Sequence, residues 1–125
     1  MNVSFETIGS VTVVKPGGSH LDAARAKEFR RDVIDKLSPP CQVLLDLSEI
    51  RFIDSSGCGA ILACSRRVNP KSDGVGDLKL CGVTKQVRLV FEMVRIHKVL
   101  DILNTREEAI QAFEANSAAP ALPIR

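Results

Sequence analysis

The chain contains no tryptophan and no tyrosine, and its 125 residues include only five phenylalanines. With so few aromatic rings, it lacks the stacking platforms on which many proteins bind unpaired bases or sugars. The formal net charge of +2 is too small for the basic stripe typical of nucleic-acid binding. No segment approaches the ~20 apolar residues of a membrane span, and the first ten residues lack the basic and apolar stretches of a signal peptide. We therefore expect neither a nucleic acid nor a membrane as a partner.

Cysteine and histidine are too scattered to indicate a disulfide framework or a metal site. The cysteines form no C-x-x-C pair and lie among apolar neighbours, at Cys41, Cys58, Cys64 and Cys81. The two histidines, His20 and His97, are far apart in the sequence, whereas a metal site needs clustered ligands. The pattern predicts reduced, mostly buried thiols in a cytoplasmic protein without a metal or other cofactor.

The chain does contain a regular alternation of strand and helix patterns, in a length suited to one domain. Alternating or continuous apolar runs predict strands at 3–8, 11–16, 42–47, 78–83 and 99–103. Amphipathic patterns and start signals predict helices at 23–37, 57–68, 85–94 and 107–113. Residues that favour helix starts precede three of these helices, namely Asp22, Thr84 and Thr105. In the helix 85–94, the residues expected to face inward are Val87, Val90, Phe91 and Val94.

The resulting order, β-β-α-β-α-β-α-β-α, predicts an α/β fold. An N-terminal hairpin joins a mixed, mostly parallel central sheet covered by about four helices. In such sheets, functional residues gather where strands end and helices begin. The segment FIDSSGCGAIL (52–62) occupies a junction of this kind and is the best candidate for a functional site.

The residues of this junction support two interpretations. Ser55 or Ser56, placed just before the helix, can accept a hydrogen bond from a free backbone N–H and so cap the helix. Gly57 and Gly59 leave the first turn bare, so that another molecule can approach closely. A phosphate on a serine here would meet free N–H groups and the positive end of the helix dipole, and would not unfold the helix. A plain cap and a regulatory phosphorylation site both stay open on these grounds.

The segment VLLDLSEIRFIDSSGCGAIL (43–62) resembles the signature of the STAS domain, the family of bacterial anti-sigma factor antagonists. The likeness continues in HLDAARAKEFR (20–30), which is similar to the segment that opens the family's first helix. Residues 78–113 are similar to the family's closing strand-helix-strand-helix half. We therefore expect a STAS domain over residues 1–114 and a flexible C-terminal tail over residues 115–125.

This resemblance implies a role in partner switching. Family members of this kind bind a serine kinase that doubles as an anti-sigma factor, and their binding releases the sigma factor. The kinase phosphorylates the serine that follows the motif's aspartate, here Ser55, and a PP2C-type phosphatase reverses the modification. Asp54, Ser56 and Gly57 would border the phosphoacceptor, and Asp22 matches an acidic position near the same surface. The resemblance implies a ligand and substrate rather than an enzyme, and we expect a monomer or weak dimer.

The sequence departs from the family pattern in three places. Ser19 stands where the family usually has glycine, which affects the shape of the loop before the first helix. Cys58 replaces the common leucine after the motif, and we expect it to be a packing thiol. The loop 69–77 is longer than usual, which makes it a candidate for adjusting partner choice.

Other functions fit the sequence less well. A triad of Ser55, His97 and Asp46 would indicate a hydrolase, but the serines precede the glycines instead of forming G-x-S-x-G. A phosphoacceptor receiver domain needs paired carboxylates for Mg²⁺ after its first strand, and the segment after Val14 has none. Within the family, a second role stays open: a non-enzymatic interaction or scaffold subunit of a stress-signalling complex, or of a membrane complex that transports lipids or anions.

Overall fold

The computed structural model describes residues 1–39, 41–70 and 76–118. Its main sheet has five strands in the order β1-β2-β4-β6-β7. The first pair, β1 and β2, is antiparallel, and every other neighbouring pair is parallel. The strands are β1 (Val3–Ile8), β2 (Val11–Pro16), β4 (Gln42–Asp46), β6 (Asp77–Cys81) and β7 (Asp101–Leu103). This arrangement confirms the predicted α/β fold with its N-terminal hairpin.

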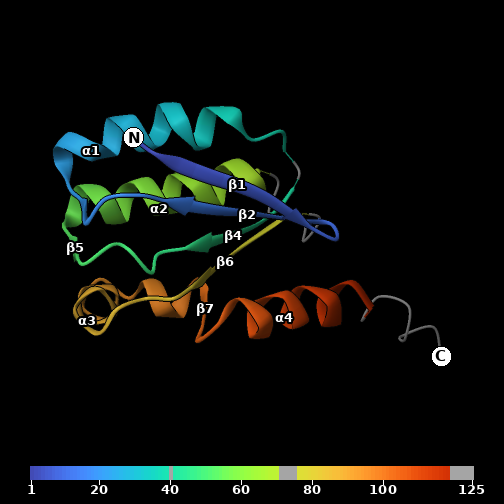
Figure 1. Cartoon of the computed structure of the whole chain (residues 1–125). Helices are drawn as coiled ribbons and strands as arrows, with labels where there is room; N and C mark the ends of the chain where they lie inside the picture. Colours follow the sequence, from blue (N-terminus) through green and yellow to red (C-terminus); the bar gives the residue numbers. More distant parts are fainter. Residues whose placement is uncertain (40, 71–75, 119–125) are drawn as a thin grey trace.

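In the described part of the chain, four α-helices pack around the sheet, as Figure 1 shows. They are α1 (Ala23–Asp32), α2 (Ser55–Val68), α3 (Lys85–Met93) and α4 (Arg106–Ala118). Short 3-10 helices, Ile34–Lys36 and Ile96–Lys98, follow α1 and α3. The helices α1 and α2 lie side by side on one face of the sheet, α4 packs on the other face, and α3 lies beside the small strand β5 (Figure 1).

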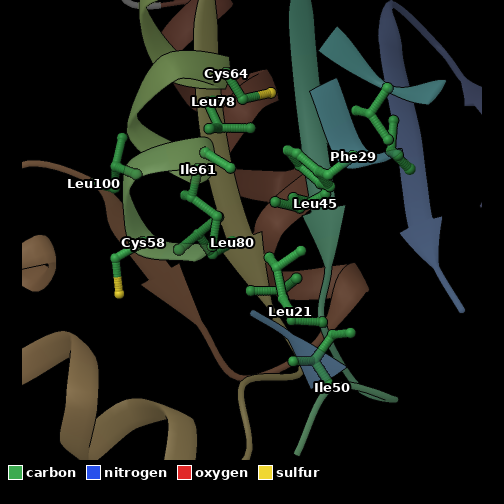
Figure 2. Close-up of a cluster of buried hydrophobic side chains, with 14 of the residues drawn as sticks. Leu21, Phe29, Leu45, Ile50, Cys58, Ile61, Cys64, Leu78, Leu80 and Leu100 are labelled. Carbon is green, nitrogen blue, oxygen red and sulfur yellow. The ribbon is translucent and has the colours of Figure 1, made fainter. Parts of the chain in front are cut away.

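The larger core lies between the sheet and the pair α1 and α2. Val14, Leu45 and Leu80 stand opposite one another across three strands, and all three are fully buried. Figure 2 shows Leu45, Leu78 and Leu80 of the sheet near Ile61 of α2. Such burial is the main stabilising contribution to a domain of this size.

A buried cation interrupts the opposite face of the sheet. Lys79 of β6 is 1% exposed, and its Nζ lies 2.7 Å from Asp101 and 3.0 Å from Asp77. The Lys79 ammonium also lies 5.1 Å from the ring centroid of Phe113 on α4. Burial opposes the charge on Lys79, but the hydrogen bonds to Asp101 and Asp77 outweigh it and raise the pKa of the amine.

A second, two-stranded sheet was not predicted. Its strands, β3 (His20–Leu21) and β5 (Phe52–Ile53), are parallel, with Leu21 opposite Ile53. Strands of two residues are too short to produce a periodic sequence pattern, so neither is among the strands predicted from the sequence. This small sheet brings the residues that follow it, Asp22 and Asp54, to the starts of two neighbouring helices.

Several predicted boundaries need correction. The helix predicted at 23–37 ends at Asp32, and α2 begins at Ser55, two residues earlier than expected. Val94 was expected to face inward but is 48% exposed, because α3 ends there and Arg95 turns the chain with a φ of 66°. The last helix continues through Ala118, into the segment predicted as a tail. The rest of that tail, 119–125, and most of the loop 69–77 lie outside the described residues.

Candidate phosphorylation and partner-binding site

The N-terminus of α2 presents two exposed serines. Ser55 and Ser56 are the first two residues of the helix, and both are exposed. Among the described residues, neither hydroxyl has a hydrogen-bond partner. Two adjacent hydroxyls are therefore available to solvent or to another protein at this junction.

The cap of α2 is Asp54, which corrects the expectation that a serine caps it. Asp54 leaves β5 with an extended φ of −118°, and its Oδ1 accepts a hydrogen bond from the Gly57 N–H at 3.0 Å. A carboxylate at this position satisfies one of the free N–H groups of the first turn and complements the helix dipole. With Asp54 in that role, the serines fall inside the helix rather than before it.

Asp54 also joins α2 to α1. Its second oxygen, Oδ2, accepts a hydrogen bond from the Ala23 N–H at 3.1 Å. Asp22 caps α1, as predicted, through a 3.1 Å hydrogen bond from the Arg25 N–H to its Oδ1. Asp54 therefore links the starts of the two helices, Asp22 caps α1 alone, and Ser55 and Ser56 directly follow Asp54.

Gly57 is buried beneath this surface, in the first turn of α2. A Cβ at Gly57 would collide with the Leu21 carbonyl oxygen and would lie 2.7 Å from Cγ1 of Ile53. Only glycine lets the first turn of α2 pack this closely on β3 and β5. Gly59 differs, since a Cβ there would meet nothing within 4 Å. The bare, accessible position in this helix is therefore Gly59, and Gly57 is required by internal packing.

Cys58, one turn into α2, is buried. Burial raises the pKa of its thiol, and the negative charge of Asp54 raises it further. The thiol therefore stays protonated near neutral pH and is a poor nucleophile. This agrees with the expected packing role.

The residues of the hypothetical triad make other contacts. Asp46, at the carboxyl end of β4, accepts a hydrogen bond from Nε of Arg106 at 2.9 Å and another from the Ser48 N–H at 2.9 Å. His97 is exposed on the 3-10 helix after α3. The described contacts thus give no support to a nucleophile-base-acid arrangement with Ser55.

Exposed apolar side chains gather on α3, the helix that packs beside β5. Leu89 is 56% and Met93 81% exposed, one helical turn apart on α3, and Val94 adjoins them at 48%. We call these three residues the α3 apolar surface. The helix packs beside β5, where the half-exposed Phe52 contacts His20 with ring centroids 5.4 Å apart and ring planes tilted by 45°. Large apolar side chains gathered in this way are typical of protein contact sites.

Comparison with known proteins identifies the family to which this fold belongs. The sequence profile of the STAS domain matches residues 2–109. The chain therefore belongs to the STAS domain family.

Two relatives with similar sequences are named as anti-sigma factor antagonists. The chain is 29% identical to the anti-sigma F factor antagonist of Paenibacillus polymyxa over 75 residues, which are 60% of this chain and 62% of that protein. It is 32% identical to BtrV of Bordetella bronchiseptica over 73 residues, 58% of this chain and 60% of that protein. The matched region thus spans about three fifths of each relative.

Solved structures share the fold at low sequence identity. The phosphorylated form of the Bacillus cell fate determinant SpoIIAA is 22% identical, with a TM-score of 0.62, and the match covers 90% of this chain and 99% of that one. The murine anion transporter Slc26a9 is 21% identical, with a TM-score of 0.70, and the match covers 88% of this chain but 18% of the transporter. Across the described ranges of the present chain, no helix has the length and apolar character needed to cross a bilayer.

Proposed function

We propose that this protein is an anti-sigma factor antagonist that binds a serine kinase acting as an anti-sigma factor, and that phosphorylation of Ser55 ends this binding. One observation carries the proposal: the Ser55 hydroxyl is exposed and has no hydrogen-bond partner among the described residues, while Asp54 caps the helix. Modifying Ser55 therefore breaks no hydrogen bond within the described part of the chain. On this proposal the protein acts in the cytoplasm and is not itself an enzyme.

The local electrostatics allow a phosphate to be accommodated in the free protein. A phosphoserine at Ser55 adds nearly two negative charges at the helix N-terminus, where the dipole is worth ~0.3–1 kcal/mol for an exposed anion. Asp54 already places a negative charge beside it. In a complex with a partner that fits the unmodified protein, this added charge must be desolvated or meets like charges. Either effect weakens the complex.

The α3 apolar surface extends the proposed contact region. Leu89 and Met93 project from a helix that packs beside β5, and β5 leads directly into Asp54 and Ser55. Asp22, Asp54, Ser55 and Ser56 supply a polar, negatively charged part, with Gly57 beneath, and α3 supplies an apolar part. Interfaces commonly combine a desolvated apolar centre with charges that set specificity.

A second candidate is a non-enzymatic subunit of a larger complex, either a stress-signalling scaffold or a lipid- or anion-transport assembly. The likeness to a region of Slc26a9 favours it, because that protein carries this fold as part of an anion transporter. The uncommitted hydroxyl of Ser55 favours the antagonist. Affinity capture of a serine kinase, rather than a permease, supports the first function over the second.

The direct test is phosphorylation by candidate serine kinases from the same genome, with the site mapped by mass spectrometry. We expect modification of the wild type and of Ser56→Ala, and none of Ser55→Ala. A PP2C-type phosphatase should remove the phosphate. Undiminished phosphorylation of Ser55→Ala would contradict the assignment of the site.

A further inference from the structure

The edge strand β1 lies at the opposite end of the sheet order from β7, and only β2 pairs with it in the described structure (Figure 1). Its residues Ser4 to Thr7 are all exposed, including Phe5 at 45%. Natural edge strands usually carry a proline, a lysine or a bulge that prevents pairing with another chain. The segment VSFETI has no proline or lysine, and its register with β2 is continuous from Val3 to Ile8.

The hairpin geometry determines which backbone groups of β1 are free. A two-residue turn, Gly9 and Ser10, joins the strands, and Gly9 has a φ of 61°. The flanking pair Ile8 and Val11 is then a hydrogen-bonded pair, and such pairs alternate along the ladder. Val3, Phe5 and Thr7 therefore direct their N–H and C=O groups away from β2. Pro16, which has no N–H, lies opposite Val3, in agreement with this alternation.

The charge on this edge is small and partly compensated. Glu6 is the one ionisable side chain in β1, and its Oε1 lies 3.0 Å from Nη1 of Arg106 on α4, which also contacts Asp46. An approaching strand thus meets a single carboxylate along these residues. The strand can be desolvated at lower cost than an edge that carries free lysines or glutamates.

We infer that β1 pairs antiparallel with β1 of a second copy of this chain, with the two-fold axis passing through Phe5. Only residues with outward N–H and C=O groups can exchange hydrogen bonds, and placing Phe5 opposite Phe5 of the second copy pairs all three of these residues. In this register Glu6 faces Ser4 and Val3 faces Thr7. Shifting the pairing by two residues places Glu6 opposite Glu6 in one direction, which is unfavourable.

The two phenylalanines at the axis supply the apolar contribution. Directly opposed aromatic side chains stabilise antiparallel pairs, and Phe5 is the large exposed apolar residue of this strand. A single strand pair buries less than a standard interface of about 1,600 Å². The association is therefore weak and reversible, and it leaves Ser55 and the α3 apolar surface on other parts of the molecule.

A charge-swap experiment tests this interface by sedimentation velocity over a dilution series that reaches millimolar concentration. We expect reversible dimerisation of the wild type and at least about tenfold weaker association of Phe5→Lys and of Phe5→Glu, because each variant places like charges opposite each other. An equimolar mixture of the two variants should dimerise again. Met93→Glu, which changes an exposed apolar residue on α3, should dimerise like the wild type.

Each alternative outcome overturns the inference. These outcomes are a wild type that stays monomeric throughout, Phe5 variants that associate like the wild type, and a mixture that stays monomeric. Backbone amide exchange of the wild type gives a test that needs no variant: the Phe5 and Thr7 amides should become more protected as concentration rises, and unchanged protection would contradict the pairing. Since the inference does not depend on the kinase, phosphorylation of Ser55 in the Phe5 variants distinguishes its failure from failure of the proposed function.

Discussion

The carboxylate of Asp54 accepts a hydrogen bond from the backbone N–H of Ala23 at 3.1 Å, across 31 residues of sequence. Its other oxygen holds the Gly57 N–H of its own helix at 3.0 Å. One side chain therefore fixes the N-termini of both α1 and α2. Because Ser55 is the next residue, the position of the proposed phosphoacceptor depends on this carboxylate.

Asp54→Ala should lower the free energy of unfolding more than Asp22→Ala does. The first substitution removes two hydrogen bonds that join two helices, whereas the second removes the single cap bond of α1. Loss of one cap typically costs about 1 kcal/mol, so we expect ~1 kcal/mol for Asp22→Ala and ~2 kcal/mol for Asp54→Ala. Urea denaturation measures both values. Equal losses would show that the bond to Ala23 contributes nothing.

Ser55→Asp should weaken binding to the cognate kinase by at least about tenfold and leave the fold intact. The added charge lies at an exposed helix N-terminus, where it is tolerated, but it must be desolvated in the complex. Isothermal titration calorimetry measures the affinity, and circular dichroism checks the fold. Ser55→Asn is the matched control of equal shape and no charge, and it should bind much more tightly than Ser55→Asp. Equal affinity of Ser55→Asp and wild type would contradict the proposal that negative charge at this position ends kinase binding.

Leu89→Glu and Met93→Glu should each weaken kinase binding without loss of stability. Both side chains are more than half exposed, so the fold gains little from them, whereas a partner interface gains from burying them. Phe5→Glu is the matched control, since it introduces the same charge on the edge strand β1, away from α3. Binding that weakens equally in all three variants would indicate a general charge effect instead of a contact on α3.

Long, repeating features of the fold could be predicted from the sequence, and short or cooperative ones could not. The buried strand 42–47 and the amphipathic helices have patterns that extend over several residues, and these were confirmed. The strands β3 and β5 have two residues each and form only because they pair with each other. Sequence patterns cannot show such pairing between distant segments.

The candidate site shows the same division. The residues of the motif were identified, and Asp22 was correctly expected to cap α1. The choice among Asp54, Ser55 and Ser56 as cap depends on which residue has extended backbone, and only the pairing of β5 determines this. Likewise, the exposure of Val94 follows from the left-handed conformation of Arg95, which no apolar periodicity indicates.

Gly57→Ala and Gly59→Ala should have opposite effects on stability, although both replace a glycine in the first half of α2. The new methyl group at Gly57 collides with the Leu21 carbonyl, which cannot move without disturbing β3. We therefore expect the free energy of unfolding to fall by ~2 kcal/mol or more. At Gly59 the methyl group meets open space, and alanine's higher helix propensity should add about 0.5–1 kcal/mol. Thermal denaturation of the two variants measures both changes in stability. A tolerated Gly57→Ala would show that the close packing of α2 on β3 is adjustable.

The ion pair between Asp46 and Arg106 should make stability depend on pH in the acidic range. Burial is the largest influence on Asp46 and raises the pKa of its carboxyl, but the hydrogen bonds from Ser48 and Arg106 together outweigh it, and the pKa is lowered overall. A lowered folded-state pKa contributes stability that is present above the unfolded pKa of about 3.9 and is lost as pH falls through the folded value.

Arg106→Gln leaves a nearly buried carboxylate without its counterion, so at pH 7 we expect the free energy of unfolding to fall by about 1–3 kcal/mol. The difference from wild type should shrink as pH falls below about 4, because protonated Asp46 no longer needs the guanidinium. Glu6→Gln, which removes the exposed partner of the same arginine, should cost much less. Urea titrations at several pH values measure these differences, and a pH-independent difference for Arg106→Gln would show that the arginine acts through packing rather than through charge.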